Sequence, residues 1–287
     1  MSERRPAPTV GQVVLGRRLQ ELREAAGLKR EEAARVLRVA PATVRRMEMA
    51  EVALKIPYVQ VLLETYGVPA EEATDFVNLA EEANQPGWWQ RFHDVLPEWF
   101  SLYVSLEGAA RLIRSYEPHF MPGLLQTEAY ARAVMEGGTI AQEGVEAVER
   151  HVSLRMTRQR LLERDDAPHL WVIIDETVLR RPVSIHGKVM RDQLTKLLEI
   201  TEDRKVTVQV AEFTAGPHPG TYAPFSLFRF AEPELPDMVF TEYLTGALYL
   251  DSRREVAAHL EVLDHMTTHA ASAVQTKKIL RRYRREY

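Results

Sequence analysis

Apolar residues in the first 66 positions of the chain recur at the spacing of an α-helix. In the first run they fall every three or four residues, at Leu15, Leu19, Leu22 and Ala26. This spacing places them on one face of a helix over residues 14–26, which Gly27 ends. Similar runs predict a helix over residues 30–37, a third that begins at Pro41, and a fourth after Pro57. The N-terminal region is therefore predicted to be an all-α bundle of short helices.

The connection between the second and third predicted helices is very short. Only Arg38, Val39 and Ala40 separate them, and a small residue, Ala34, stands where the two backbones must approach. Two short helices joined by so few residues have the geometry of a helix-turn-helix, whose second helix enters the major groove of DNA. The pattern therefore predicts a DNA-binding motif.

The pattern changes to one typical of strands after residue 169. Residues 170–174 form an apolar run, and the valines at 206, 208 and 210 alternate with polar residues. A predicted helix over residues 188–200 lies between these strands, so we expect one parallel crossover. Other expected elements are helices over 107–116 and 145–163 and short antiparallel strands over 225–230, 238–243 and 247–250.

These elements predict a multidomain protein, with an all-α helix-turn-helix bundle followed by a mixed α+β domain. We place the helix-turn-helix domain at residues 1–68 and a helical linker at 69–87, which ends in Asn84-Gln-Pro-Gly87. The α+β domain, expected to bind a partner or a ligand, occupies residues 88–287.

Composition limits the class of protein. A chain of 287 residues with 45% hydrophobic and 27% charged residues is typical of a globular protein of about two domains. The absence of cysteine excludes disulfides, thiolate metal sites and thiol catalysis. Because the longest compact apolar run is far shorter than a membrane span, we expect no membrane insertion and a cytoplasmic location.

Charge is distributed unevenly along the chain. Residues 1–66 contain 12 Lys and Arg against 8 Asp and Glu, whereas residues 67–287 contain 25 against 33. The first region is therefore basic by +4 and the second acidic by −8, although the whole chain carries only −4. This asymmetry favours nucleic-acid binding by the N-terminal region.

The segment from Leu15 to Ala34, with Val44-Arg-Arg-Met-Glu48 after it, resembles the phage-repressor-like (XRE-type) helix-turn-helix family. The resemblance implies that the third helix contacts bases through Ala42, Thr43, Arg45 and Arg46. Of these, Arg46 is the strongest candidate, because an arginine can form two hydrogen bonds with a guanine edge. The resemblance also implies phosphate contacts by Lys29, Arg30 and Arg18, and a structural salt bridge between Arg23 and Glu48.

Three residues depart from the pattern of this family. Arg38 and Ala50 stand where glycine is usual, and a left-handed backbone costs a non-glycine residue about 1 kcal/mol. Ala40 replaces the usual Ser or Thr helix cap, at a similar cost. These departures keep open a second interpretation, in which the bundle serves only to bind other proteins.

The C-terminal region also contains recognisable segments. Ser115-Tyr-Glu-Pro118, Pro122 to Arg132, Asp175 to Pro182 and Gln193 to Leu198 resemble the C-terminal domain of WhiJ-like actinobacterial regulators. This resemblance implies a transcription factor that receives its signal through the C-terminal domain. It also implies a small antitoxin-like or regulatory partner protein encoded by a neighbouring gene.

Several side chains in this region are candidates for binding a ligand or partner. They are the tryptophans of an aromatic-rich segment and two residues of a Gly- and Pro-bounded loop: Trp88, Trp89, Trp99, His218 and Tyr222. Asp175 and Glu176 follow a predicted strand with His186 nearby, but an acidic pair at a helix start needs no catalytic role. His265 and His269 are four residues apart on a helix, yet no third metal ligand is apparent.

The sequence as a whole predicts a sequence-specific DNA-binding transcriptional regulator that acts as a homodimer on double-stranded DNA. Two copies on adjacent half-sites combine the few base contacts that each makes. We expect regulation through the C-terminal domain by a small protein or a small-molecule effector, and no enzymatic activity, catalytic residue, metal or cofactor. The alternatives are an antitoxin-like interaction module with little DNA binding of its own and, with least support, an enzyme with a small-molecule pocket.

Overall fold

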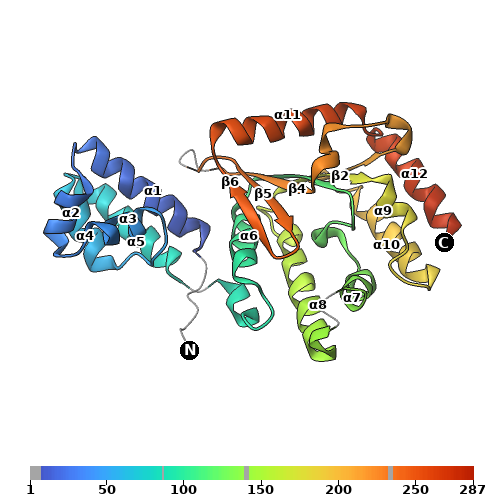
Figure 1. The fold of residues 1–287 in the computed structure, drawn as a ribbon, viewed down its shortest axis with the longest axis horizontal. Helices are drawn as coiled ribbons and strands as arrows, with labels where there is room; N and C mark the ends of the chain where they lie inside the picture. Colours follow the sequence, from blue (N-terminus) through green and yellow to red (C-terminus); the bar gives the residue numbers. More distant parts are fainter. Residues whose placement is uncertain (1–7, 86, 139–141, 232–234) are drawn as a thin grey trace. The chain divides into compact units, whose positions relative to one another are not determined.

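The computed structural model describes residues 8–85, 87–138, 142–231 and 235–287 (Figure 1). Its contacts divide the chain into two compact units. One is built mainly from residues up to His93 and Pro97–Ala109, and the other mainly from Ala110–Ala231 and Pro236–Tyr287. The predicted fold class is therefore confirmed: a helical bundle is followed by a mixed α and β domain.

The first unit begins with a bundle of helices whose ends follow from the local sequence. A capping box between Thr9 and Gln12 starts the first helix, and Gly27 follows its end with a left-handed φ of 70°. Proline occupies the first turn of the third and fourth helices, where its missing N–H has no cost. The helices are α1 (Val10–Ala25), α2 (Arg30–Leu37), α3 (Pro41–Glu48), α4 (Ile56–Thr65) and α5 (Ala70–Ala83).

The core of the bundle extends beyond the end that the sequence suggested. Leu19, Val44 and Leu62 are fully buried in it, and Phe76 and Ala80 of α5 belong to the same cluster. We expected residues 69–87 to be a helical linker. The helix is present, but its apolar face packs into the bundle, because Phe76 would otherwise lie in water.

The first unit also contains a short 3₁₀ helix, Trp88–Phe92, and helix α6 (Glu98–Ala109). The second unit contains the helices α7 (Glu128–Glu136), α8 (Val145–Gln159), α9 (Glu176–Arg180), α10 (Gly187–Ile200), α11 (Arg253–His269) and α12 (Ala273–Glu286). Its strands are β1 (Leu112–Glu117), β2 (His169–Asp175), β3 (Val206–Ala211), β4 (Phe225–Arg229), β5 (Met238–Tyr243) and β6 (Gly246–Leu250).

The strands that the structure describes form one mixed sheet in the order β3-β2-β1-β4-β5-β6. The first three run parallel, with Val172 of β2 opposite Val208 of β3 and Ser115 of β1. The other three pair antiparallel. The predicted parallel crossover through α10 is thus confirmed, as are the antiparallel strands that follow it.

Strand β1 corrects one prediction. We expected a helix over residues 107–116, but α6 ends at Ala109 and Leu112–Glu117 is a central strand. Ile113 is paired with Leu170 of β2 on one side and with Phe228 of β4 on the other. Pairing on both sides comes from residues distant in sequence, and it overrides the local helical spacing.

Helix α11 packs along one face of the sheet, and Figure 1 shows α8 on the opposite side. Leu263 and Met266 of α11 are buried with Tyr116, Leu227 and Val239 of the sheet. Helix α12 packs against α10 and β3 at the parallel edge. In the part of the chain that the structure describes, no helix is long and apolar enough to span a bilayer.

Candidate DNA-binding site

The helix-turn-helix is formed by α2 and α3. Arg38 ends α2 in the left-handed region, with φ 55° and ψ 42°, and Ala50 follows α3 with φ 53°. These are the two positions where the resembling family usually has glycine, so both non-glycine residues carry a strained backbone. Ala40 precedes α3 in an extended conformation and provides no side-chain cap.

Close packing against α1 fixes the C-terminal end of α3. Val44 and Met47 of α3 are buried in the bundle core. A Cβ atom added at Gly16 would lie 2.6 Å from the carbonyl oxygen of Glu48 and 2.8 Å from that of Met47. Glycine is therefore required where α1 meets α3, a requirement that the spacing of apolar residues does not reveal.

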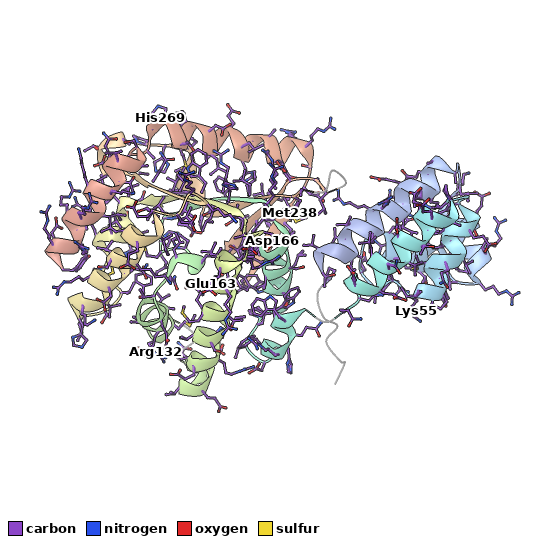
Figure 2. The ribbon with its side chains drawn as sticks, turned by 180° about the vertical axis from the view of Figure 1, so that it is seen from behind. Lys55, Arg132, Glu163, Asp166, Met238 and His269 are labelled. Atoms are coloured by element: carbon purple, nitrogen blue, oxygen red, sulfur yellow. The ribbon has the colours of Figure 1, made fainter. Side chains whose placement is uncertain are left out.

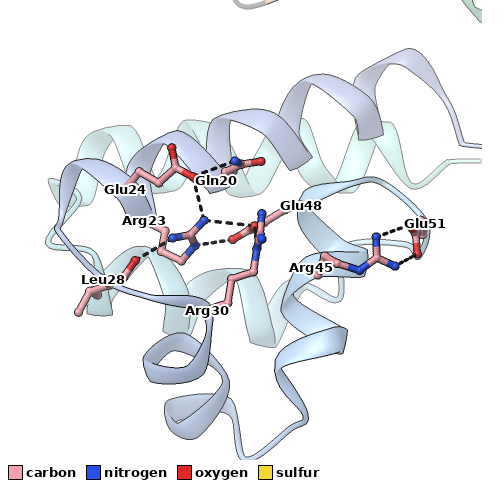
Figure 3. A network of polar contacts seen from close by, with 8 residues as sticks. All are labelled: Gln20, Arg23, Glu24, Leu28, Arg30, Arg45, Glu48 and Glu51. Atoms are coloured by element: carbon pink, nitrogen blue, oxygen red, sulfur yellow. Dashed lines mark hydrogen bonds and ion pairs between the residues drawn. The ribbon is translucent and has the colours of Figure 1, made fainter. Parts of the chain in front are cut away.

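The buried carboxylate of Glu48, in α3, links this helix to α1 and α2 (Figure 3). Glu48 is 1% exposed, and its two oxygens accept hydrogen bonds from Arg23 Nε and Arg30 Nε, each at 2.6 Å. Arg23 also donates to the carbonyl oxygen of Leu28 at 2.7 Å, and its hydrogen bond with Glu48 raises the pKa of its guanidinium. The network contains the Arg23–Glu48 pair that the family resemblance implies, and it fixes the orientation of α3 relative to α1 and α2.

The residues assigned to phosphate contacts lie in different places. Lys29 is exposed at the start of α2, where its backbone N–H is held by Glu32 at 2.8 Å. Arg30 is beside it, with 36% of its side chain exposed despite the bond to Glu48. Arg18 instead forms an ion pair with Glu72 of α5 at 3.0 Å. Lys29 and Arg30 thus share the start of α2, whereas Arg18 faces α5.

The outer face of α3 carries the four residues assigned to base contacts. Ala42 and Arg45 are exposed, and Thr43 and Arg46 are half-buried. Arg46 makes only a long contact of 3.4 Å from Nη2 to Thr43 Oγ1, and its buried Nε has no hydrogen-bond partner among the described residues. Because Nε is buried, a contact with a base edge depends on the terminal nitrogens of Arg46.

Arg45 is held by a residue that the sequence did not single out. Its two terminal nitrogens donate to both carboxylate oxygens of Glu51 at 2.8 Å (Figure 3). Both side chains are exposed, so water and salt weaken this pair. Glu51 lies beyond the end of α3, outside the helical periodicity that would have indicated the contact.

In the second unit, His218 lies near the carboxyl ends of the parallel strands. Its Nε2 is 3.8 Å from Asp175 Oδ2 and 3.5 Å from the Tyr116 hydroxyl, which donates to Asp175 at 3.1 Å. A cavity of about 280 Å³ adjoins His218 and is also lined by His265, His269 and several small apolar residues. His269 is labelled at the end of α11 in Figure 2. Tyr222 is in a short 3₁₀ helix of the same loop, but its side chain lies outside the described residues.

The tryptophans form edge-to-face ring contacts. Trp88 contacts Trp89 at 6.0 Å and Phe92 at 6.3 Å between ring centroids, and it remains 41% exposed. Trp99 contacts Phe100 at 5.6 Å. These contacts are typical of structural packing, and the exposed Trp88 is the tryptophan best placed to meet a partner.

The candidate acid and metal residues have structural contacts. Asp175 caps α9 by accepting from the Thr177 N–H at 2.8 Å, whereas the exposed His186 lies before α10. The rings of His265 and His269 stack at 4.1 Å. Within the described ranges, no three His, Cys, Asp or Glu side chains are arranged to hold a metal ion.

Two family models match this chain. Residues 14–76 match a family described as a helix-turn-helix domain, and residues 100–282 match one described as a domain of unknown function (DUF5753). No curated protein and no solved structure matches the chain. The first match covers α2, α3 and the turn between them, and the second covers more than half of the chain.

Proposed function

The chain belongs to the DUF5753 family, whose function is unknown, and it carries a helix-turn-helix domain before that region. On this basis we propose that it is a sequence-specific transcriptional regulator that reads the major groove of DNA with α3. At a general level, its helix-turn-helix domain makes it a DNA-binding regulator. The proposal of major-groove reading rests on two features of α3: hydrogen bonds from Arg23 and Arg30 to Glu48 hold the helix in place, and its outer face presents the Arg46 guanidinium. A held helix loses little entropy on binding, and a bidentate arginine contact distinguishes guanine from other bases.

The experiment starts from a pool of random duplexes, from which the purified full-length chain selects a preferred sequence. Fluorescence anisotropy then compares that duplex with a scrambled one over a range of salt concentrations. We expect tighter binding to the selected duplex, weakening as salt rises because phosphate contacts release counterions. Equal binding to both duplexes, or failure to enrich any sequence, would overturn the proposal.

We further propose that the chain acts as a homodimer. One α3 presents few side chains to base edges, and two copies on half-sites about one helical turn apart combine their binding energies. The selected sequence is then an inverted repeat with half-site centres about 10 base pairs apart. Selection of a single asymmetric half-site would contradict this arrangement.

The second domain is proposed to receive the regulatory signal rather than to catalyse a reaction, as its resemblance to WhiJ-like actinobacterial regulators suggests. The cavity beside His218 is our candidate site for a small effector, because it combines apolar walls with three imidazoles. The exposed Trp88, which the structure places in the first unit rather than the second, is our candidate contact for a small antitoxin-like partner protein.

One observation favours the alternative of an interaction module with little DNA binding. Arg45 and Arg30, both assigned to DNA, are held by Glu51 and Glu48. On that alternative, Glu51→Gln would leave DNA binding undetectable. On our proposal, it frees Arg45 and tightens binding severalfold, which the same anisotropy assay measures.

A further inference from the structure

The C-terminal helix α12 concentrates positive charge on an otherwise acidic region. Its 14 residues include six Lys or Arg and one Glu. Residues 110–287 carry 24 Lys and Arg against 25 Asp and Glu, so without α12 the remaining residues of this range are acidic, with 18 against 24. A helix dipole favours cations near its C-terminal end, but that preference covers only the last turn.

The apolar face of α12 is fully used by the fold. Thr276, Ile279, Leu280 and Tyr283 are buried against α10 and β3. The Tyr283 hydroxyl donates to the buried carboxylate of Glu176 on α9. Because these side chains are inside the domain, α12 cannot insert them into a membrane, although basic amphipathic helices often bind membranes in that way. Its basic side chains are therefore fixed on the outer surface.

Three cations on this surface are available to a ligand. Lys278, Arg281 and Arg285 are exposed, and their spacing of three and four residues places them on one face of α12. None of the three forms a salt bridge with any side chain that the structure describes. By contrast, Lys277 is paired with Glu202 at 2.7 Å. The charge of Arg281 also helps to lower the pKa of Glu202, but no carboxylate lies within salt-bridge distance of the three cations among the described residues. A row of such cations favours a ligand with repeated negative charge.

Arg180 of α9 extends the basic surface beyond α12. Arg180 and Arg282 both reach Glu176, at 3.1 and 3.4 Å, and about half of each side chain remains exposed. One carboxylate therefore balances two guanidiniums. An open hollow of about 670 Å³ lies beside them, lined also by Tyr283, Glu286 and Tyr287. The hollow gives a bulky anion access to both arginines.

We propose that the exposed basic face of α12 is a second DNA contact, which binds backbone phosphates without reading sequence. From Lys278 to Arg285 the helix rises roughly 10 Å, and duplex DNA carries about one negative charge per 1.7 Å of its axis. The proposal rests on DNA binding by α3. Once α3 is bound, DNA is held near the rest of the chain at a high effective concentration.

The test measures the salt dependence of DNA binding by the full-length chain, with Arg281→Gln/Arg285→Gln as the variant. If each arginine neutralises one phosphate, the slope of log affinity against log salt falls by about 1.8, and affinity at 0.15 M salt falls roughly 30-fold. The ratio of affinities for the selected and scrambled duplexes stays unchanged. Arg281→Lys/Arg285→Lys keeps the charges and therefore keeps the slope.

Arg253→Gln/Arg254→Gln is the matched control, since it removes the same charge from exposed positions at the start of α11. An equal fall in slope for both double variants would show an effect of net charge alone and overturn the proposal. An unchanged slope for Arg281→Gln/Arg285→Gln would also overturn it. The proposal would also be overturned if Arg281→Gln/Arg285→Gln weakened binding of polyglutamate but left DNA binding unchanged. Absence of DNA binding by the wild-type chain would instead reject the proposed function itself.

Discussion

Glu48 in the bundle and Glu176 in the sheet domain are both buried carboxylates, and each anchors a helix with a basic outer face. Glu48 is 1% exposed and Glu176 4% exposed. Glu48 binds Arg23 and Arg30 behind α3, whereas Glu176 binds Tyr283 behind α12 and the Phe213 N–H at 2.9 Å. The same kind of contact therefore serves both helices.

The two sites differ in how far their cations are enclosed. Arg23 is buried with Glu48, so this pair is closed to water, although the second cation on Glu48, Arg30, keeps 36% of its side chain exposed. The guanidiniums that reach Glu176 are half exposed and can be rehydrated. A closed pair suits a helix that must hold its orientation for base reading. An open pair suits a surface that binds charge without strict geometry.

Breaking the closed pair has the largest expected effect. Glu48→Ala leaves the buried Arg23 with only the exposed Glu24 as a charge partner, and we expect a loss of about 3–5 kcal/mol from the free energy of unfolding of the bundle. Differential scanning calorimetry would record this as a fall of roughly 15–30 °C in the bundle transition. Glu51→Ala breaks only the exposed pair with Arg45 and serves as the control, with a loss of no more than about 1 kcal/mol. Equal losses for the two variants would contradict the account.

Breaking the open pair has a smaller effect. Burial alone would raise the pKa of Glu176, but hydrogen bonds from Tyr283, the Phe213 N–H and Arg180 together lower it. The stabilisation from the ionised carboxylate is then complete above its ordinary pKa of 4.5 and is lost as pH falls below that value. Glu176→Gln should cost the sheet domain about 1–2 kcal/mol at neutral pH.

The same variant should flatten the dependence of the sheet domain's stability on acid pH, which urea unfolding at several pH values measures. Glu202→Gln, in the exposed pair with Lys277, is the control and should leave the midpoint at neutral pH unchanged. A steep loss of stability below pH 4.5 that persists in Glu176→Gln would assign the acid sensitivity to other carboxylates.

Relieving backbone strain has the smallest expected effect and leaves the Glu48 pair intact. Arg38→Gly should stabilise the bundle by about 1 kcal/mol, because glycine adopts the left-handed φ of 55° without a steric penalty. Arg35→Gly, within α2, should instead destabilise by about 0.5–1 kcal/mol. Denaturation midpoints would separate the two. A loss of stability in both variants would show that Arg38 makes a contact worth more than the strain.

Local patterns predicted much of the bundle and part of the sheet domain. The bounds of α2 and the start of α3 followed from apolar spacing and from Pro41. Strand β1 was missed because its identity depends on pairing with β2 and β4, which lie far away in sequence. The spacing of apolar residues within a segment does not indicate which distant strands it will pair with.

Side-chain contacts were harder to predict than elements. The family resemblance implied the Arg23–Glu48 pair, but apolar spacing gave no sign that Arg30 shares the same carboxylate. Glu51 and Gly16 escaped notice because their roles depend on how the end of α3 meets its surroundings. Tertiary geometry decides these contacts, and the spacing of residues does not encode it.

The central claim is that α3 reads base edges through Arg46, and DNA binding by the Arg46→Ala variant tests it most directly. Competition anisotropy against single-base variants of the selected duplex would compare it with the wild type and with Arg35→Ala, an exposed arginine of α2. We predict that Arg46→Ala loses about 1–3 kcal/mol of discrimination at one base position, while Arg35→Ala keeps it. Full retention of base preference by Arg46→Ala would contradict the account.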